Sequence, residues 1–233
     1  MDAAVREVID RAAARHGGWD RWESLGSIVI DVESLGGAVP WVKGLGRTFP
    51  QMGRCTVDPR RRVLTAHDFP SPGSEVVFER GRIVGEEPED YRQRFAGFAK
   101  LRRWSPADAT YFFGYALTHY LGLPFSLVDA QVIGHRPRRS ETGCDRLTVR
   151  YPKGSHTHST LEHFHFDASG LLVRHDYHAE IIGPGMNGAH YSRDYVEVDG
   201  LQVARSRRVV TRLGPWAVPI PVLVARLQVV ELR

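Results

Sequence analysis

The segment Val198-Asp199-Gly200-Leu201 joins two long stretches in which apolar and polar residues alternate. An Asp-Gly pair in this setting predicts a two-residue β-hairpin, because both central positions of the turn need a positive φ angle. Similar alternation predicts strands through the last hundred residues, at about 145–151, 158–166, 171–182, 189–198, 201–211 and 222–232. This part of the chain is therefore predicted to form an antiparallel β meander.

The first half mixes helices with strands. A helix is predicted over residues 3–16, because apolar residues recur on one face and Gly17-Gly18 follows. Strands are expected at 27–33, 45–57, 62–69 and 75–79, with a tight turn near 79–83, and a helical pattern covers 87–103. The chain is thus predicted to be mainly β, in the α+β class, and to form a single domain over residues 1–233.

A second helix is predicted from residue 106 to about 121. Ser105 is a capping residue, Pro106 suits the first turn, and Gly122 and Pro124 stop the helix. Tyr111, Tyr115 and His119 share one of its faces, and further aromatic residues occupy another. A helix that is aromatic on two faces needs burial on both, or a ligand on one of them.

Composition excludes several classes of protein. Apolar residues make up 42% and charged residues 25% of the chain, which is typical of a folded globular protein. The net charge is only +4, acidic residues are spread throughout, and no stretch of 18 apolar residues predicts a membrane span. The N-terminus has no basic segment followed by an apolar run, so a cytoplasmic protein is predicted. Cys55 and Cys144 permit one disulfide, but two reduced thiols are favoured in that compartment.

The histidines gather in one region. Seven of the eleven fall within residues 156–190. If the hairpin over 158–182 folds about a four-residue loop at 167–170, Phe166 opposes Leu171 and Glu162 opposes His175. Alternation then places one set of side chains on a common inner face: Phe166, Leu171, Phe164 and Val173 near the loop, followed by Glu162, His175, Tyr177 and His158.

The predicted Glu162–His175 pair leaves three interpretations open. A carboxylate beside an imidazole can exchange protons near neutral pH, with Tyr177 donating to a developing oxyanion, as in a cofactor-independent isomerase, cyclase or hydrolase. The same pair could contact a ligand, or it could be a structural cross-strand pair. Glu162, His175 and Tyr177 are the catalytic candidates if the protein is an enzyme.

Metal binding is a further alternative. His156 and His158, and likewise His163 and His165, have the spacing that lets two imidazoles share one face of a strand, and Glu162 or His175 could complete such a site. The sequence has no HExxH motif and no paired CxxC motif. No resident metal or other cofactor is therefore predicted, and a metal-dependent enzyme using the segment 156–190 is the third choice.

Nucleic acid is not predicted as a partner. Basic clusters occur at 60–62, 135–139 and 205–208, but the first two lie in turn-like contexts that favour solvated loops. Neither a GxGxxG nor a GxxxxGK[ST] phosphate loop is present.

Two segments resemble a known group of bacterial proteins. They are ARHGGWDRWESLGSI at 14–28, and SRDYVEVDGL at 192–201 followed by Arg207-Arg208-Val209. Together they are similar to the LolA-like lipoprotein-carrier superfamily. The resemblance implies a strongly curved antiparallel sheet, an unclosed barrel, with an N-terminal helix and central helices covering its concave side. It also implies that a greasy molecule is carried in the concavity.

The first functional prediction follows from that resemblance. We expect the chain to bind a hydrophobic or aromatic small molecule, or a lipid, in the hollow of the half-barrel. The expected contact residues are Tyr111, Tyr115, His119, His158, Phe164 and Tyr191. Carriers of the superfamily are exported, whereas this sequence predicts a cytoplasmic protein, so a different hydrophobic molecule is expected. The sequence also allows a homodimer, because 222–230 is a long apolar strand that would pair with another copy if it were an edge.

Overall fold

The described strands belong to one antiparallel sheet. The structure is a computed structural model that describes residues 2–45, 53–87, 90–139, 143–153, 155, 157–183, 185–214 and 216–233. In chain order the strands are β1 (Ile28–Gly36), β2 (Arg54–Asp58), β3 (Val63–His67), β4 (Glu75–Glu79), β5 (Arg82–Ile83), β6 (Gln131–Arg136), β7 (Asp145–Arg150), β8 (Leu161–Phe166), β9 (Leu172–His178), β10 (Asn187–Val198), β11 (Leu201–Leu213) and β12 (Trp216–Leu232).

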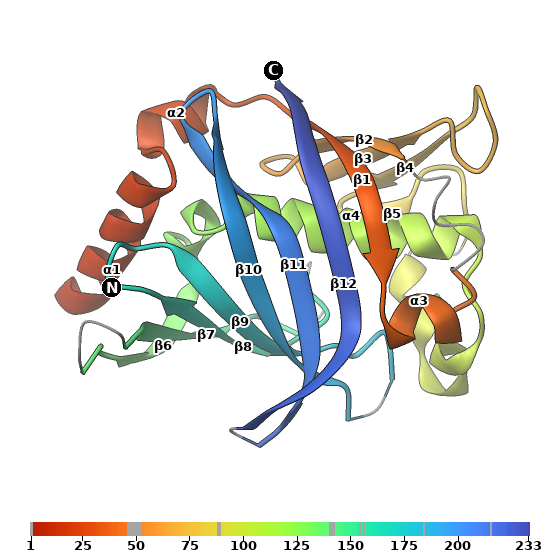
Figure 1. The fold of residues 1–233 in the computed structure, drawn as a ribbon. Helices are drawn as coiled ribbons and strands as arrows, with labels where there is room; N and C mark the ends of the chain where they lie inside the picture. The colour runs from red at the N-terminus through yellow and green to blue at the C-terminus, as the bar shows by residue number, and fades with distance from the viewer. Residues whose placement is uncertain are drawn as a thin grey trace.

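The order of the strands joins the two halves of the chain. They lie side by side as β5-β4-β3-β2-β1-β12-β11-β10-β9-β8-β7-β6 (Figure 1). Strand β12 pairs with β1 on one side, from Ile28 opposite Leu232 to Gly36 opposite Val224, and with β11 on the other. Within the described ranges β5 and β6 are the two free edges, so this curved sheet is an unclosed barrel and confirms the predicted fold class.

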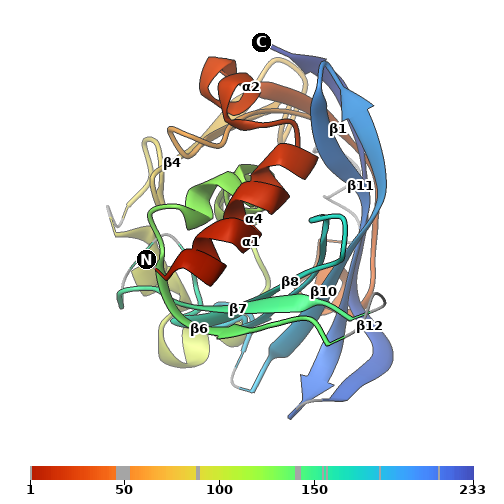
Figure 2. The same cartoon turned by 90° about the vertical axis from the view of Figure 1, so that its left-hand side faces the viewer.

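The helices lie on the concave side and at the ends of the sheet. They are α1 (Ala3–Arg15), α2 (Trp19–Ser24), α3 (Ala38–Val42) and α4 (Pro106–Gly122), with 3-10 turns η2 (Tyr91–Phe95), η3 (Gly97–Leu101) and η4 (Phe125–Leu127). Helix α4 crosses the hollow, and α1 lies across strands β6 to β8 (Figure 2). No helix among the described residues is long and apolar enough to cross a membrane.

Local sequence explains where α4 begins and why it is buried. The Ser105 hydroxyl accepts from the Asp108 backbone N–H, the Asp108 carboxylate accepts from the Ser105 backbone N–H, and Pro106 stands in the first turn. Aromatic and apolar residues on both faces leave α4 buried on nearly all sides, as the sequence predicts. One apolar core lies between α4 and strands β1 to β5, and a second lies between α1 and strands β7 to β9.

Several predicted elements are corrected. The pattern at 87–103 forms the short turns η2 and η3 rather than a regular helix. Of the strand predicted at 45–57, only Arg54–Asp58 and its neighbours fall within the described residues, since 46–52 lie outside them. The last strand begins at Trp216 and is paired on both sides, so it is not the free edge that the homodimer hypothesis required.

Cys55 and Cys144 are both free thiols, as the sequence analysis favoured.

Gly114 lets α4 approach the sheet closely. A Cβ atom at this position would lie 2.1 Å from the Cγ atom of Phe78 on β4. Gly114→Ala is therefore expected to lower the free energy of unfolding by about 1–3 kcal/mol, although alanine favours helix. Gly122→Ala is the matched control, because its Cβ would meet other atoms only at 3.9 Å or more. Urea unfolding of the two variants measures the difference, and an equal effect of both would contradict the close packing.

Candidate functional site

The pairing of β8 with β9 differs from the predicted register. Phe166 opposes Leu172 rather than Leu171, and Phe164 opposes His175, because Val173 forms a β-bulge. The loop is one residue longer than predicted, and the bulge adds one more residue to β9. Together they shift β9 by two residues, so the side chains beyond the bulge point to the same faces as predicted. Leu172, rather than Leu171 and Val173, points into the core. Glu162, Phe164, His175 and Tyr177 still share the inner face, as predicted.

Three buried side chains meet on this inner face. One carboxylate oxygen of Glu162, Oε2, lies 2.8 Å from His175 Nε2 and 3.1 Å from His119 Nε2. Glu162 and His175 come from neighbouring strands, whereas His119 comes from α4, which lies over them. Each of the three side chains is no more than 4% exposed. The sequence predicted the first pair but did not place His119 with it.

The charge state of this trio follows from its surroundings. Burial alone would raise the pKa of Glu162, but the two imidazoles outweigh burial and lower it to about 2. Burial lowers the pKa of His175, despite the nearby carboxylate. The arrangement is therefore an ionised carboxylate that accepts hydrogen bonds from the Nε2 atoms of both rings. The three ligand atoms lie within 4.8 Å of one another, so the trio is also the described group best placed to hold a metal ion.

The other predicted contact residues fall in the same closed interior. Tyr111 bonds His158 at 2.8 Å, and Tyr120 donates to the Tyr177 hydroxyl at 3.1 Å. Burial raises the pKa of Tyr115 well above its ordinary value, so its hydroxyl stays protonated. The space left between Tyr115, His158 and Tyr177 is only about 10 Å³, just enough for one water molecule. Helix α4 thus fills the hollow in which a greasy ligand was expected.

Tyr191 is the site residue that the structure places elsewhere. It pairs with Arg174 and Arg208 and stacks near arginine side chains on the outer face of β10, so it is corrected as a residue of the hollow. Its neighbour His190 points inward instead, opposite His175, and is 1% exposed. Arg207 on β11 is also buried and forms no ion pair among the described residues. Sequence reasoning missed both residues, although alternation from His175 across two strands would have indicated His190.

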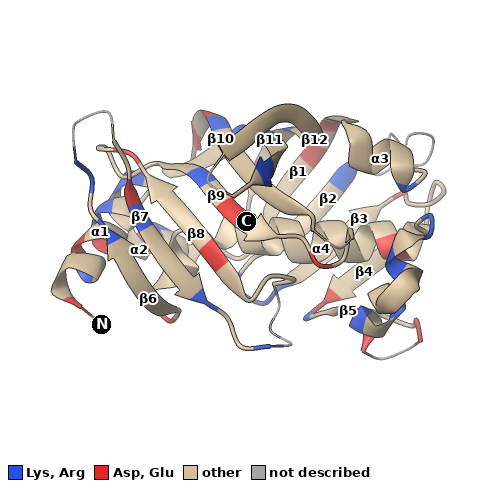
Figure 3. Cartoon of the chain, turned by 90° about the horizontal axis from the view of Figure 1, so that it is seen from below, with Lys and Arg blue, Asp and Glu red and all other residues tan. Residues whose placement is uncertain are grey.

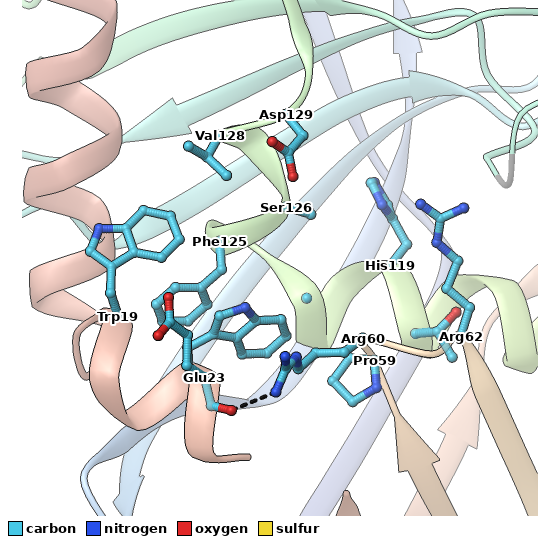
Figure 4. Close-up of a pocket in the computed structure, with 13 residues that line it drawn as sticks. Trp19, Glu23, Pro59, Arg60, Arg62, His119, Phe125, Ser126, Val128 and Asp129 are labelled. Carbon is cyan, nitrogen blue, oxygen red and sulfur yellow. Dashed lines mark hydrogen bonds between the residues drawn. The ribbon is translucent and has the colours of Figure 1, made fainter. Parts of the chain in front are cut away.

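An open pocket lies at the C-terminal end of α4. Its volume is about 380 Å³. Figure 4 shows the residues that line it. Trp19 and Trp22 pack against Phe125, one edge-to-face at 5.4 Å and the other stacked at 4.6 Å between ring centroids. Arg62 and His119 lie at the other end of the pocket in Figure 4. Further lining residues are Glu23, Pro59, Arg60, Thr118, Gly122, Ser126, Val128 and Asp129.

His119 connects the pocket with the buried trio. Among the described residues it is the one that lines both the open pocket and the small space beside Glu162 and His175. The guanidinium of Arg60 is bonded to the backbone carbonyl of Glu23. No hydrogen bond or ion pair of the Arg62 guanidinium is formed within the described ranges. The pocket therefore has an aromatic end and a cationic end, and it meets the polar interior at one side chain.

The histidine-rich metal hypothesis is narrowed by these positions. His163 bonds Thr148 and His165 lies 3.5 Å from Asp176, both on the outer face of the sheet. They therefore cannot join Glu162 in one site. His156 lies outside the described residues.

The charged residues do not gather on one element. Figure 3 shows Lys and Arg spread over several elements, with Asp and Glu between them.

Comparison with known proteins supplies neighbours in fold but none in sequence. No family model matches the chain, and no curated protein matches it. A DUF1329 family protein from Desulfovibrio piger is 14% identical, with a TM-score of 0.47, over 98% of this chain and 92% of that one. A LolA superfamily protein from Nitrosomonas europaea is 9% identical, with a TM-score of 0.46, over the same shares of the two chains. A putative outer membrane lipoprotein-sorting protein domain from Vibrio parahaemolyticus is 11% identical, with a TM-score of 0.42, over 97% of this chain and 90% of that one.

Proposed function

We propose that the chain binds a small molecule with an aromatic or hydrophobic body and an acidic group, in the pocket of Figure 4. The observation that supports this proposal is that three aromatic rings lie at one end of the pocket, and that the Arg62 guanidinium at the other end has no partner among the described residues. A volume of about 380 Å³ is within the usual range for small-molecule sites. The planar body would stack on Trp19, Trp22 and Phe125, while the acidic group would pair with Arg62.

This proposal moves the ligand from the hollow of the sheet to its rim. Tyr111 and Tyr115 lie on α4 itself, His158 and Phe164 are buried, and none of the four lines the open pocket, so they would shape the interior rather than touch the ligand. His119 keeps its proposed role as a contact residue, because it lines the pocket. The acid/base alternative through Glu162, His175 and Tyr177 stays a prediction, as do the cytoplasmic location and the absence of a nucleic-acid partner.

Two dyes with the same aromatic body test the proposal. Anilinonaphthalene sulfonate carries a negative charge, whereas N-phenyl-1-naphthylamine is neutral. We expect saturable one-to-one binding of the sulfonate with an affinity about tenfold higher than that of the amine, because one charge-assisted hydrogen bond contributes on the order of 1.5 kcal/mol. Arg62→Gln should remove this difference, whereas Trp22→Leu should weaken the binding of both dyes. Fluorescence titration measures each affinity.

Arg61→Gln is the matched control for the pocket arginine. Arg61 is the next residue along the chain, but its side chain is 80% exposed, pairs with Asp58, and does not line this pocket. It should leave both affinities unchanged. Equal affinity for the charged and the neutral dye, or equal effects of the two arginine variants, would contradict an acidic ligand at Arg62.

A further inference from the structure

The buried trio has the form of a metal site. His119 Nε2, Glu162 Oε2 and His175 Nε2 converge from α4, β8 and β9, although they are separated by up to 56 positions in the chain. We propose that these three side chains bind a divalent first-row transition metal ion of the Zn²⁺ or Fe²⁺ kind. Metal binding here does not depend on the ligand proposed for the outer pocket, so either proposal can fail alone.

The distances between the ligand atoms fit this assignment. Metal–nitrogen and metal–oxygen bonds of about 2.0–2.2 Å in tetrahedral or octahedral sites separate neighbouring ligand atoms by roughly 3.0–3.5 Å. The Glu162 oxygen lies 2.8 Å and 3.1 Å from the two ring nitrogens, and the whole set lies within 4.8 Å. An ion therefore needs the two oxygen–nitrogen separations to widen by a few tenths of an ångström, which rotation about the side-chain bonds supplies.

The donor chemistry favours a transition metal over calcium or magnesium. Two imidazole nitrogens and one carboxylate oxygen are the ligands that zinc, iron, cobalt and nickel share, whereas calcium and magnesium prefer oxygen alone. The Glu162 carboxylate is only 2% exposed, so its charge would lie in a region of low dielectric. A divalent cation at this point would compensate that charge.

The surroundings also leave a place for a fourth ligand and a route for the ion. The small space of about 10 Å³ touches all three side chains and has room for one water. Three protein ligands and one water is the arrangement of catalytic rather than structural zinc sites. Because His119 also lines the open pocket, the ion would reach the trio from that side, and its water would face the inner end of the pocket.

Metal content and titration of untagged protein test the assignment. The protein is dialysed against a chelator and titrated with Zn²⁺ by calorimetry, and a separate sample is loaded with Co²⁺ for its visible spectrum. We expect one Zn²⁺ per chain and a Co²⁺ spectrum typical of nitrogen and oxygen ligands in a four- or five-coordinate site. Glu162→Gln keeps the shape of the side chain and should weaken Zn²⁺ binding by at least about 100-fold.

Two surface histidines supply the matched control. His163→Gln and His165→Gln alter the same strand, β8, but on its outer face, so the stoichiometry and affinity should not change. Loss of Zn²⁺ binding in these variants with retention in Glu162→Gln would assign the metal to the surface and overturn the proposal. Absence of stoichiometric Zn²⁺ and of a Co²⁺ spectrum in the wild-type protein would overturn it without any variant. Circular dichroism shows whether Glu162→Gln has folded, and His119→Gln provides a second test of the same ligand set.

Discussion

Asp108→Ala is expected to lower the free energy of unfolding by about 2–4 kcal/mol, because it leaves the buried Tyr91 hydroxyl without its acceptor and two half-buried arginines without their counter-charge. The Asp108 side chain is fully buried and accepts from Arg102 at 2.6 Å and 2.7 Å, from Arg94 at 3.2 Å and from the Tyr91 hydroxyl at 3.1 Å. Burial alone would raise the pKa of Asp108, but the bonds from Arg102 and Ser105 outweigh it and hold the pKa at about 2. The same carboxylate caps α4, so its loss also frees the start of the helix that fills the hollow.

Urea unfolding followed by circular dichroism measures this effect. Asp31→Ala is the control, since Asp31 forms an ion pair with Arg54 at the surface and should cost no more than about 1 kcal/mol. Ser105→Ala removes only the capping hydroxyl and should cost about 1 kcal/mol. If Asp108→Ala were no more harmful than Asp31→Ala, the network around Asp108 would not stabilise the fold.

Stability is expected to fall steeply when the pH is lowered from 6.5 to 4.5. Burial lowers the pKa of His16 to about 4 and that of His158 to about 3, so both rings stay neutral in the folded protein over this range. The unfolded chain binds a proton at each ring below about pH 6.5, so it takes up more protons than the folded protein and stability decreases with falling pH. Each of the two rings should contribute a loss of about 2 kcal/mol between pH 6.5 and pH 4.5.

Between pH 6.5 and pH 4.5 the change in stability comes from the buried histidines and not from the buried carboxylates. Asp108 and Asp176 have lowered pKa values of about 2, so their contributions are present above pH 4 and are lost only below it. Urea unfolding at several pH values, in the presence of a chelator, measures the slope. His158→Gln should retain an acceptor for the Tyr111 hydroxyl and flatten the slope. A slope equal to that of the wild type would show that His158 does not titrate in this way.

The sequence predicted the faces of the strands better than their partners. Alternation along β8 and β9 placed Glu162, His175 and Tyr177 on one face, because a side chain can only point to one side or the other. The partner of each residue depended on the loop length and on a bulge at Val173. The bulge leaves no mark in the sequence, since no glycine or proline stands at Val173, and Gly170 marks the loop but not its exact length.

The open pocket could not be predicted, because its walls come from three distant parts of the chain. Trp19 and Trp22 precede the sheet, Pro59 to Arg62 form the turn between β2 and β3, and Phe125 follows α4. Taken alone, the aromatic residues are explained by packing in the core, and the Pro59–Arg62 segment is explained as a solvated turn. His119 could be singled out from the helical face it shares with Tyr111 and Tyr115, but its contact with Glu162 depends on how α4 crosses the sheet.

The pairing of β1 with β12 affects how the chain is made. Gly36 ends β1 and Trp216 begins β12, so about 180 residues are synthesised before β1 can gain its second neighbour. At ribosomal rates of about 5–20 residues per second, this interval lasts roughly 10–40 s. During that time the edge of β1 that will later pair with β12 exposes unpaired backbone groups beside Ile28 and Ile30. An exposed strand edge of this kind can pair with another chain and lead to aggregation. The yield of folded protein in a cell should therefore depend on how well this one edge is protected until the last strand emerges.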